Sequence, residues 1–402
     1  MTKKFNLRSL GLSLVAAMVF TACQKDDDVN PIENKGEFKH VRVLVTDESA
    51  TKLTQINPAT AGITSFDTKF PMGNLYATAN GRFAAVVYGS QNLTEMFDTG
   101  LEFHGNHVDM KGTPKWAAIT AAGSKPAHFK SRGAESLIFN DGDGTLHLAN
   151  EANFHTPSAQ FTTINAGLTA HHGAMAQFDN GNIAVTESGN RVRVINKNGG
   201  LVHASTVEVA RIHGNATDGT NAVFGSFISP DQTTGGVLVV NQTGEQRVIA
   251  NPAGFGAVRL GTILYGMGAK KFVGYGATKG AYMIDLAANK ITPIYNGTDA
   301  VQCKMDYAGN NLLVLTMDGK LRVYNLSTGA LKKEGMVISP VASGDSFKPV
   351  IEATAKYAYI AMPNLGEVHQ VNLDDFNKVV KHKVSAKPVR LTLLGFETDE
   401  SH

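Results

Sequence analysis

Short apolar runs separated by glycine, asparagine and aspartate make up almost the whole chain after residue 39. Val41 to Thr46 is one such run, and Phe83 to Tyr88 and Asn311 to Thr316 are others. Runs of this length, rich in valine, leucine and aromatic residues, indicate β-strands, and Asn180-Gly181 and Asp318-Gly319 are typical hairpin turns. Helical spacing of apolar residues is scarce, so the pattern predicts an all-β fold.

The predicted strands recur in groups of four. One group covers residues 173–205 and another covers 300–335. The segment from Gly81 to Val87 has counterparts from Gly181 to Glu187 and from Gly309 to Thr316. Four-stranded units that repeat at a period of roughly 45 residues are typical of the blades of a β-propeller.

The number of units predicts how the ring closes. Innermost strands are expected near residues 74, 126, 172, 211, 256, 300, 349 and 389, which gives eight blades. The last of these strands has no outer strands after it, and the run from Val41 has no inner strand before it. Pairing the two chain ends therefore completes one blade, and we predict a single propeller over residues 39–398. Seven blades is the alternative, because the pattern is irregular from 227 to 270.

The first 22 residues have the pattern of a secretion signal. Lys3, Lys4 and Arg8 precede an apolar run from Leu10 to Phe20 that is too short to span a bilayer. The run ends in Phe20-Thr21-Ala22-Cys23, which resembles a bacterial lipobox. Residues 1–22 are therefore interpreted as a lipoprotein signal peptide, and Cys23 as the residue that carries the lipid.

The segment after Cys23 predicts where the protein resides. A lysine and three aspartates follow almost directly, which resembles the surface-export signal of Bacteroidetes lipoproteins. We expect a lipid-anchored protein of the cell envelope, exposed on the outer membrane, with the periplasmic face as the alternative. Residues 23–38 are polar and acidic and are predicted to form a flexible tether. With Cys23 lipidated, no intrachain disulfide can form, and Cys303 is interpreted as a small buried residue of an inner strand.

Composition and charge narrow the function classes. Hydrophobic residues make up 43% of the chain and charged residues 18%, which excludes global disorder. The formal net charge is +2, and three of the basic residues lie in the leader. No basic excess remains to contact phosphates, so nucleic acid is disfavoured as a partner.

Histidines supply the candidate chemistry. The segment from Asp98 to Pro114 is longer than a hairpin connection needs, and it contains His104, His107 and Asp109. Such a loop is the natural mobile part of a site. Imidazole and carboxylate groups are common zinc ligands, although the spacing of these three is only a moderate signal on its own.

Three successive inner strands are expected to carry more histidines. His128 lies at one, His171 and His172 at the next, and His213 at the third. Inner strands of a propeller line its central channel, so these side chains could meet there. Adjacent residues of a strand point to opposite sides, so at most one of His171 and His172 faces inward, and we favour His172.

Other polar residues are given structural interpretations. Six further histidines are expected on strand surfaces or in turns: His40, His147, His155, His203, His369 and His382. The run Asp141-Gly142-Asp143-Gly144 lacks the further acidic ligands of a calcium loop and is predicted to be a type I′ turn.

Taken together, the histidine motifs resemble a known family. Five motifs occur in the order and spacing of the periplasmic zinc metallochaperones of the AztD type: Phe103 to Asp109 (FHGNHVD), Lys125 to Phe129 (KPAHF), Phe139 to Gly144 (FNDGDG), Ala170 to Gly173 (AHHG) and Ile212 to Gly214 (IHG). The resemblance spans roughly residues 40–395. It implies a β-propeller that binds zinc and passes it to the solute-binding protein of a zinc importer. It also implies zinc ligands from the following set, of which one site would use about four: His104, His107, Asp109, His128, His172 and His213.

Two departures from the family pattern bear on the partner. Family members tend to have a histidine-rich N-terminal segment, whereas residues 24–37 here are acidic and contain no histidine. The predicted lipid anchor also differs from a soluble periplasmic protein. The expected function is therefore a non-enzymatic protein of metal transport that captures or delivers zinc, to a solute-binding protein or to another envelope protein.

Two alternatives belong to other function classes. One is a propeller that serves as a protein-interaction scaffold without metal. The other is a propeller hydrolase or lactonase, in which zinc with an open coordination position activates water. No acid–base pair or nucleophile constellation in the sequence favours the enzyme.

Overall fold

The computed structural model describes residues 39–104, 107–229 and 231–397. The predicted signal peptide, the predicted lipidation site Cys23 and the whole predicted tether, residues 23–38, lie outside these residues. No helix in the described part of the chain is long and apolar enough to cross a membrane. Two short 3-10 turns, Gly89–Gln91 and Glu151–Asn153, are the helical elements found there.

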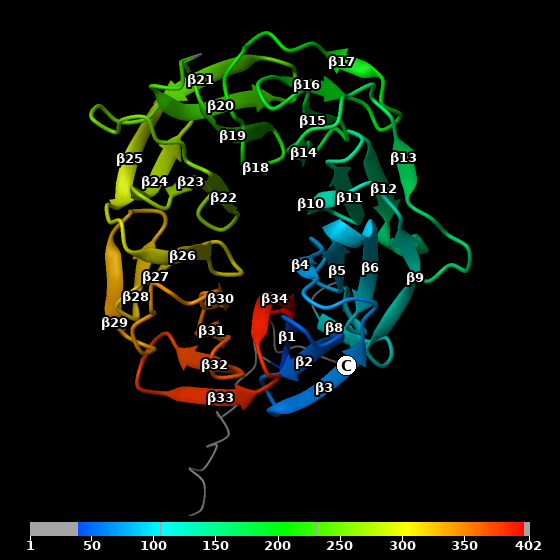
Figure 1. Cartoon of the computed structure of the whole chain (residues 1–402), viewed down its shortest axis with the longest axis vertical. Helices are drawn as coiled ribbons and strands as arrows, with labels where there is room; N and C mark the ends of the chain where they lie inside the picture. The colour runs from blue at the N-terminus through cyan, green and yellow to red at the C-terminus, as the bar shows by residue number, and fades with distance from the viewer. Residues whose placement is uncertain (1–38, 105–106, 230, 398–402) are drawn as a thin grey trace, which may run out of the picture. The chain divides into compact units, whose positions relative to one another are not determined.

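Eight four-stranded antiparallel sheets form a closed ring, which confirms the predicted eight-bladed propeller and excludes the seven-bladed alternative (Figure 1). Blades are numbered from the one that contains the first strand, and each is given from its inner strand outward. Blades 1 to 4 consist of β34 (Pro388–Phe396), β1 (His40–Asp47), β2 (Lys52–Asn57) and β3 (Gly62–Asp67); β4 (Asn74–Ala77), β5 (Phe83–Tyr88), β6 (Leu93–Asp98) and β9 (Lys115–Ala121); β10 (Pro126–Arg132), β11 (Glu135–Asn140), β12 (Leu146–Asn150) and β13 (Thr162–Ile164); and β14 (Met175–Gln177), β15 (Ile183–Thr186), β16 (Val192–Ile195) and β17 (Leu201–His203).

The second half of the ring repeats the same order. Blades 5 to 8 consist of β18 (Asn215–Thr217), β19 (Asn221–Phe227), β20 (Gly235–Asn241) and β21 (Gln246–Ala250); β22 (Thr262–Gly266), β23 (Lys271–Gly276), β24 (Gly280–Asp285) and β25 (Lys290–Tyr295); β26 (Ala300–Met305), β27 (Asn311–Thr316), β28 (Lys320–Asn325) and β29 (Leu331–Met336); and β30 (Val350–Ala353), β31 (Tyr357–Met362), β32 (Glu367–Asn372) and β33 (Val379–Lys383).

Apolar side chains fill the spaces between neighbouring blades. Leu313 of blade 7 packs in one buried cluster with Ile360 of blade 8, and Val194 of blade 4 packs in another with Phe224 of blade 5. Because both faces of each middle strand are covered by another blade, these strands are continuous apolar runs rather than alternating ones. This packing explains why the runs were recognisable in the sequence.

The ring closes through the two chain ends, as the pattern predicted. β1 pairs with β34 from His40 opposite Phe396 to Thr46 opposite Arg390. The inner strands run in the same direction, as the parallel bridge between Asp306 and Ala353 shows for two of them. We call the side of the ring where they begin the start face, and the side where they finish the end face.

Four expected elements differ from those observed. The inner strand expected near residue 256 begins at Thr262, because Gly254 and Gly256 in the segment before it have positive φ and do not continue a strand. β14 and β18 begin at Met175 and Asn215, so the histidines expected to open them lie just before them. The insertion expected as a loop forms a two-stranded hairpin, β7 (Leu101–His104) and β8 (His107–Met110).

Candidate metal centre

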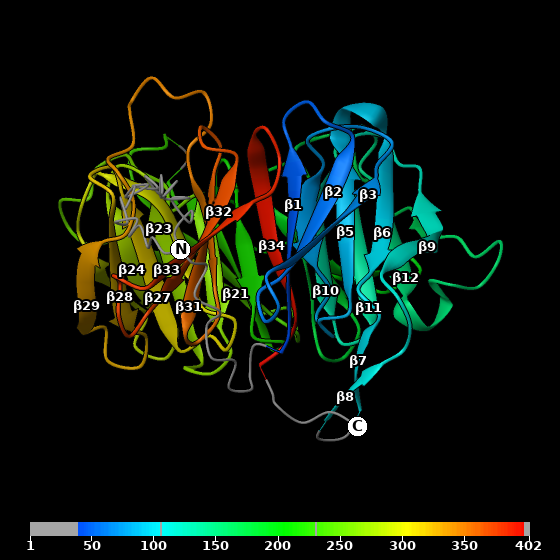
Figure 2. The same cartoon turned by 90° about the horizontal axis from the view of Figure 1, so that it is seen from below.

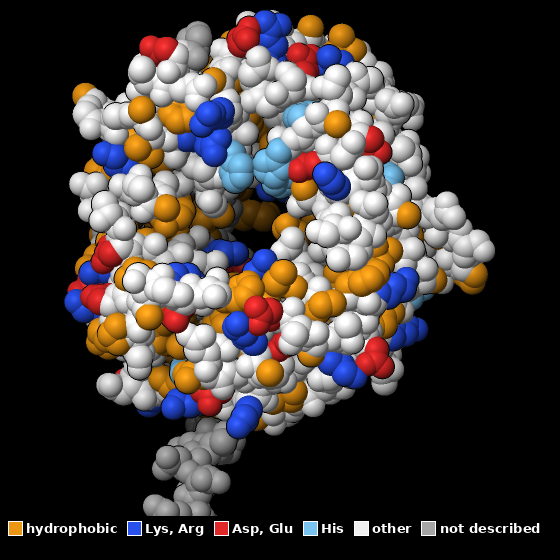
Figure 3. Space-filling model, in the orientation of Figure 1, with side chains coloured by type: hydrophobic (Ala, Val, Ile, Leu, Met, Phe, Trp, Pro, Cys, Tyr) orange, Lys and Arg blue, Asp and Glu red, His pale blue; other side chains and the backbone are white. Residues whose placement is uncertain are grey.

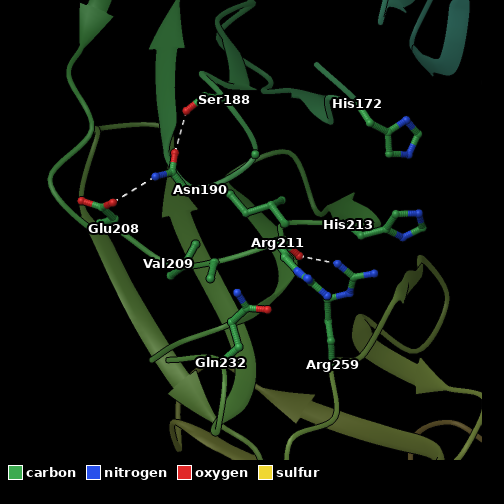
Figure 4. A pocket seen from close by; sticks show the side chains of 12 residues that line it. His172, Ser188, Asn190, Glu208, Val209, Arg211, His213, Gln232 and Arg259 are labelled. Carbon is green, nitrogen blue, oxygen red and sulfur yellow. Dashed lines mark hydrogen bonds between the residues drawn. The ribbon is translucent and has the colours of Figure 1, made fainter. Parts of the chain in front are cut away.

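Three histidines from successive blades lie together at the start face. His128 is the third residue of β10, His172 lies three residues before β14, and His213 lies two residues before β18. Figure 3 shows histidine side chains gathered at the edge of the central opening, and Figure 4 shows the rings of His172 and His213 beside each other. The ring centroids are 4.7 Å apart for His128 and His172, and 5.4 Å apart for His172 and His213.

A carboxylate that the sequence analysis assigned to a turn completes this group. Asp141 Oδ2 lies 2.5 Å from His172 Nδ1, and its Oδ1 accepts from the backbone N–H of Gly173 at 3.3 Å. The prediction of a type I′ turn for this run is wrong, because that turn needs positive φ at both central residues and only Gly144 has it. The connection is longer than such a turn. The backbone N–H of Asp141 donates to the carbonyl of Lys125 at 3.0 Å, which places the Asp141 carboxylate near the start of β10.

The hydrogen bonds fix which nitrogen of each ring is available. His172 Nδ1 donates to the Asp141 carboxylate, and His213 Nδ1 donates to the carbonyl of Gly261 at 2.7 Å. In the neutral form of each ring, Nε2 is therefore the nitrogen whose lone pair can bind a metal ion. The two Nε2 atoms of His128 and His172 are 3.3 Å apart, so the proton of His128 lies between them.

His128 is held neutral by its surroundings. Burial lowers the pKa of His128 to about 4, and the neighbouring His172, Lys130 and His213 act in the same direction, whereas Asp141 opposes them. A neutral imidazole is the form that binds a metal ion, so little competition from protons is expected at His128 near neutral pH.

The neighbouring histidine has a structural role instead. His171 Nδ1 donates to the carbonyl of Thr169 at 2.7 Å, and its Nε2 accepts from Thr186 Oγ1 at 2.8 Å. The ring also contacts Phe139 edge-on, with centroids 5.2 Å apart. Both nitrogens are thus occupied, and the structure places His172 rather than His171 beside the other two histidines.

An open pocket of about 670 Å³ lies next to His172 and His213. Arg211 and Arg259 lie on its wall, and Arg259 Nη1 donates to the backbone carbonyl of Arg211 at 2.5 Å (Figure 4). Burial and the charge of Arg211 lower the pKa of Arg259. Glu208 on the same wall forms an ion pair with Arg191. The histidine group is therefore accessible from solvent through a positively charged vestibule.

The other three predicted residues form a separate group on the β7–β8 hairpin. His104 pairs with His107 across the strands, and the candidate ligand atoms of His104, His107 and Asp109 lie within 4.8 Å of one another. Asp109 also forms an ion pair with Lys111 at 3.0 Å, which lowers the pKa of Asp109. The group contains two imidazoles and one carboxylate, with its acid already engaged by a lysine.

The hairpin lies at the end face. Its Phe103 stacks on Phe396, the last residue of β34, with centroids 5.4 Å apart, and Glu102 forms an ion pair with Arg82. Figure 2 shows β7 and β8 projecting from the lower face of the ring. With a rise of about 3.3 Å per residue, an inner strand such as β10 separates the two groups by on the order of 20 Å. The six predicted residues therefore do not converge on one site.

Other histidines are more buried than expected. His40, His147, His369 and His382 lie inside blades rather than on strand surfaces, with His382 only 3% exposed and its Nε2 2.9 Å from Gln370 Oε1. His155 contacts the buried carboxylate of Asp98 at 2.7 Å. Cys303 is buried in β26, as expected, and burial raises its thiol pKa to about 12.

Comparison with known proteins bears on the fold. No protein family matches the sequence, and no curated protein does. The crystal structure of AztD from Citrobacter koseri matches with a TM-score of 0.79 at 20% identity, over 90% of this chain and 100% of that chain. A structure of apo AztD from the same organism gives a TM-score of 0.77 at 19% identity, over 89% and 98%. The dihydro-heme d1 dehydrogenase NirN in complex with DHE gives 0.59 at 12% identity, over 87% and 74%. The chain therefore shares the β-propeller fold of these proteins.

Proposed function

We propose that this protein binds zinc at its start face, through Nε2 of His128, His172 and His213, and that it captures or delivers the metal. Asp141 would lie behind His172 and hold its ring. Imidazole is a favoured zinc ligand, and a carboxylate that accepts from the second ring nitrogen is the usual support of such a ligand. Zinc is thus the cargo of the protein rather than part of a catalytic apparatus.

The distance between the Nε2 atoms of His128 and His172, 3.3 Å, carries this proposal. Two nitrogens bound to one tetrahedral zinc at about 2.0–2.1 Å lie about 3.4 Å apart. The two rings are therefore spaced for a shared metal, and binding needs only the transfer of the His128 proton to its other nitrogen or to water.

The fold similarity supports the same function. The sequence motifs resemble AztD-type metallochaperones, and AztD structures match almost the whole propeller. On this basis we propose that the recipient is a solute-binding protein of a zinc importer or another envelope protein. The leader and Cys23 support a location at the cell envelope through a lipid anchor.

An open fourth position gives a second candidate function. Three histidines leave one tetrahedral position facing the vestibule, and zinc with such a position can activate water. A zinc hydrolase would therefore show metal-dependent turnover of a lactone or ester, whereas a carrier would show zinc exchange without turnover.

Zinc stoichiometry in two matched double variants tests the proposal. The protein carrying His128→Ala and His172→Ala is compared with one carrying His104→Ala and His107→Ala, by elemental analysis after equilibration with zinc. We expect the first variant to lose the tightly bound zinc and the second to keep it. Full retention of tight zinc by the first variant would refute the proposed site, and loss in the second alone would move it to the hairpin.

A further inference from the structure

The central channel contains a second hollow, away from the histidine group. It has a volume of about 520 Å³ and is lined by the five consecutive inner strands β26, β30, β34, β4 and β10. Figure 3 shows basic side chains on the opposite side of the central opening from the histidines. None of the proposed zinc ligands lines this hollow.

Positive charge in this hollow exceeds negative charge. Lys304 is neutralised by Glu352, with Nζ and Oε1 2.6 Å apart. Lys130 donates to the backbone carbonyl of Asn215 at 2.8 Å, and Arg390 donates through Nη1 to the carbonyl of Val389 at 3.0 Å. Within the part of the chain that the structure describes, neither Lys130 nor Arg390 forms an ion pair. Enclosed lysine and arginine side chains are rarely left without an anionic partner.

The neutral polar groups present donors as well. Asn74 Oδ1 accepts from Arg390 Nε at 2.8 Å, and Gln302 Oε1 accepts from the backbone N–H of Ile351 at 2.7 Å. With both amide oxygens engaged, each side chain has its NH₂ group left for a ligand. Glu352 supplies the one carboxylate of the lining, and Lys304 already binds it.

A tyrosine lies among these cations. Burial raises the pKa of Tyr76, while the positive charges of Arg390 and Lys304 act in the opposite direction, so both cations lie near its ring. Its hydroxyl donates to the carbonyl of Ala127 at 3.3 Å. The tyrosine therefore adds bulk to one side of the hollow, and its O–H proton is directed to the backbone.

We propose that this hollow is a binding site for a small oxyanion that carries about two negative charges. Two cations without ion pairs and two oriented amide NH₂ groups match the oxygens and charge of such a ligand. Inorganic phosphate and a short dicarboxylate share this chemistry. The inference goes beyond the proposed zinc site and does not depend on it.

Calorimetric titration of protein that was stripped of metal with EDTA and then dialysed free of EDTA tests the oxyanion site without any metal. Phosphate and succinate are titrated separately, with chloride at matched ionic strength as the reference. We expect one phosphate or succinate to bind per chain, and the preferred one identifies an inorganic or an organic ligand. No binding of either above the chloride reference would overturn the proposal.

Variants assign the binding to these side chains. Arg390→Met and Lys130→Met should each weaken the anion by about tenfold or more, because each removes a charged hydrogen-bond donor. Lys290→Met, an exposed residue of an outer strand, should bind as the wild type does. Arg390→Lys keeps the charge and should retain more affinity than Arg390→Met, which separates lost binding from lost folding. Wild-type affinity in both methionine variants would overturn the assignment.

Discussion

Replacing Asp141 by asparagine should weaken zinc binding while leaving the fold intact. The Asp141 carboxylate accepts from His172 Nδ1 at 2.5 Å, so it both orients the ring and makes its Nε2 a better donor to metal. Asparagine keeps the size and one acceptor oxygen but removes the charge. The side chain of His172 is 52% exposed, so this pair adds little to folding stability.

The expected loss follows from what such supporting carboxylates do in other metal sites. Removing one costs about 10–100-fold in metal affinity, which corresponds to about 1.4–2.7 kcal/mol. The assay is a competition titration against a chromophoric zinc chelator at pH 7.4, with thermal unfolding of the metal-free protein measured in parallel. We expect a higher zinc dissociation constant and a nearly unchanged unfolding temperature.

Asp143 provides the matched control. It lies in the same connection, but its Oδ1 accepts from the backbone N–H and the hydroxyl of Thr145 at 2.9 and 2.7 Å, so it serves its own turn. Asp143→Asn should keep wild-type zinc affinity. The reasoning is refuted if Asp141→Asn and wild type bind zinc equally, or if both asparagine variants lose the same affinity.

Three further predictions address the residues around the site and the blades. His171→Phe should change zinc affinity less than about twofold, since neither of its nitrogens faces the metal group, but lower the unfolding free energy by about 1–2 kcal/mol through the lost bonds to Thr169 and Thr186; urea unfolding and zinc titration of the same sample distinguish this from a ligand role. Gly173→Ala should lower the free energy of unfolding by about 1–3 kcal/mol and also lower zinc affinity, because a Cβ there would lie 2.3 Å from the Phe139 ring and displace the adjacent His172. Gly344→Ala is the control and should be neutral, since a Cβ at Gly344 meets open space. Equal stability of the two variants would count against this prediction. Burial lowers the pKa of His382 to about 4, so the unfolded chain takes up this proton first on acidification. The contribution of neutral His382 to the free energy of unfolding is complete above pH 6.5. It is lost as the pH falls from 6.5 to 4, by on the order of 3 kcal/mol. Urea unfolding across this range should show a shallower decline for His382→Gln, and an unchanged slope would contradict the assignment.

The blade count and the closure of the ring were predictable because they depend on local patterns. Strands such as Phe83–Tyr88 and Asn311–Thr316 are buried at every position and mostly apolar, since another blade covers each face. The inner strand at Val389 has no outer strands after it, and the strands from Val41 have no inner strand before them. The simplest arrangement pairs the two, and the structure has this pairing. The start of the inner strand expected near residue 256 was not predicted correctly, because glycines there, rather than apolar residues, decide that the strand begins at Thr262.

The site was harder to predict because it depends on where strands begin and finish. His104 and His128 are close in sequence, yet a hairpin at the end face and the start of β10 carry them to opposite sides of the ring. Asp141 was assigned to its turn, although the antiparallel pairing of β10 and β11, with Pro126 opposite Asn140, brings the residue after β11 to the start face. That register was one available signal, and the place of the segment Phe139 to Gly144 among the family motifs was another. Whether His171 or His172 faces the channel depended on hydrogen bonds to Thr169 and Thr186, which no spacing rule shows.

The blade shared between the chain ends also determines when the molecule can finish folding. β1 is synthesised early and β34 late. The pairing of Leu44 with Thr392 therefore joins residues that lie almost 350 positions apart in the sequence, and it can form only after β34 has been made. Contacts between such distant residues form slowly, and until they form β1 has an unpaired edge that can join another chain. A chain truncated before Pro388 would keep that edge permanently. Blade 1 therefore makes the burial of β1 depend on β34, because only a chain that contains β34 can bury the inner edge of its own β1.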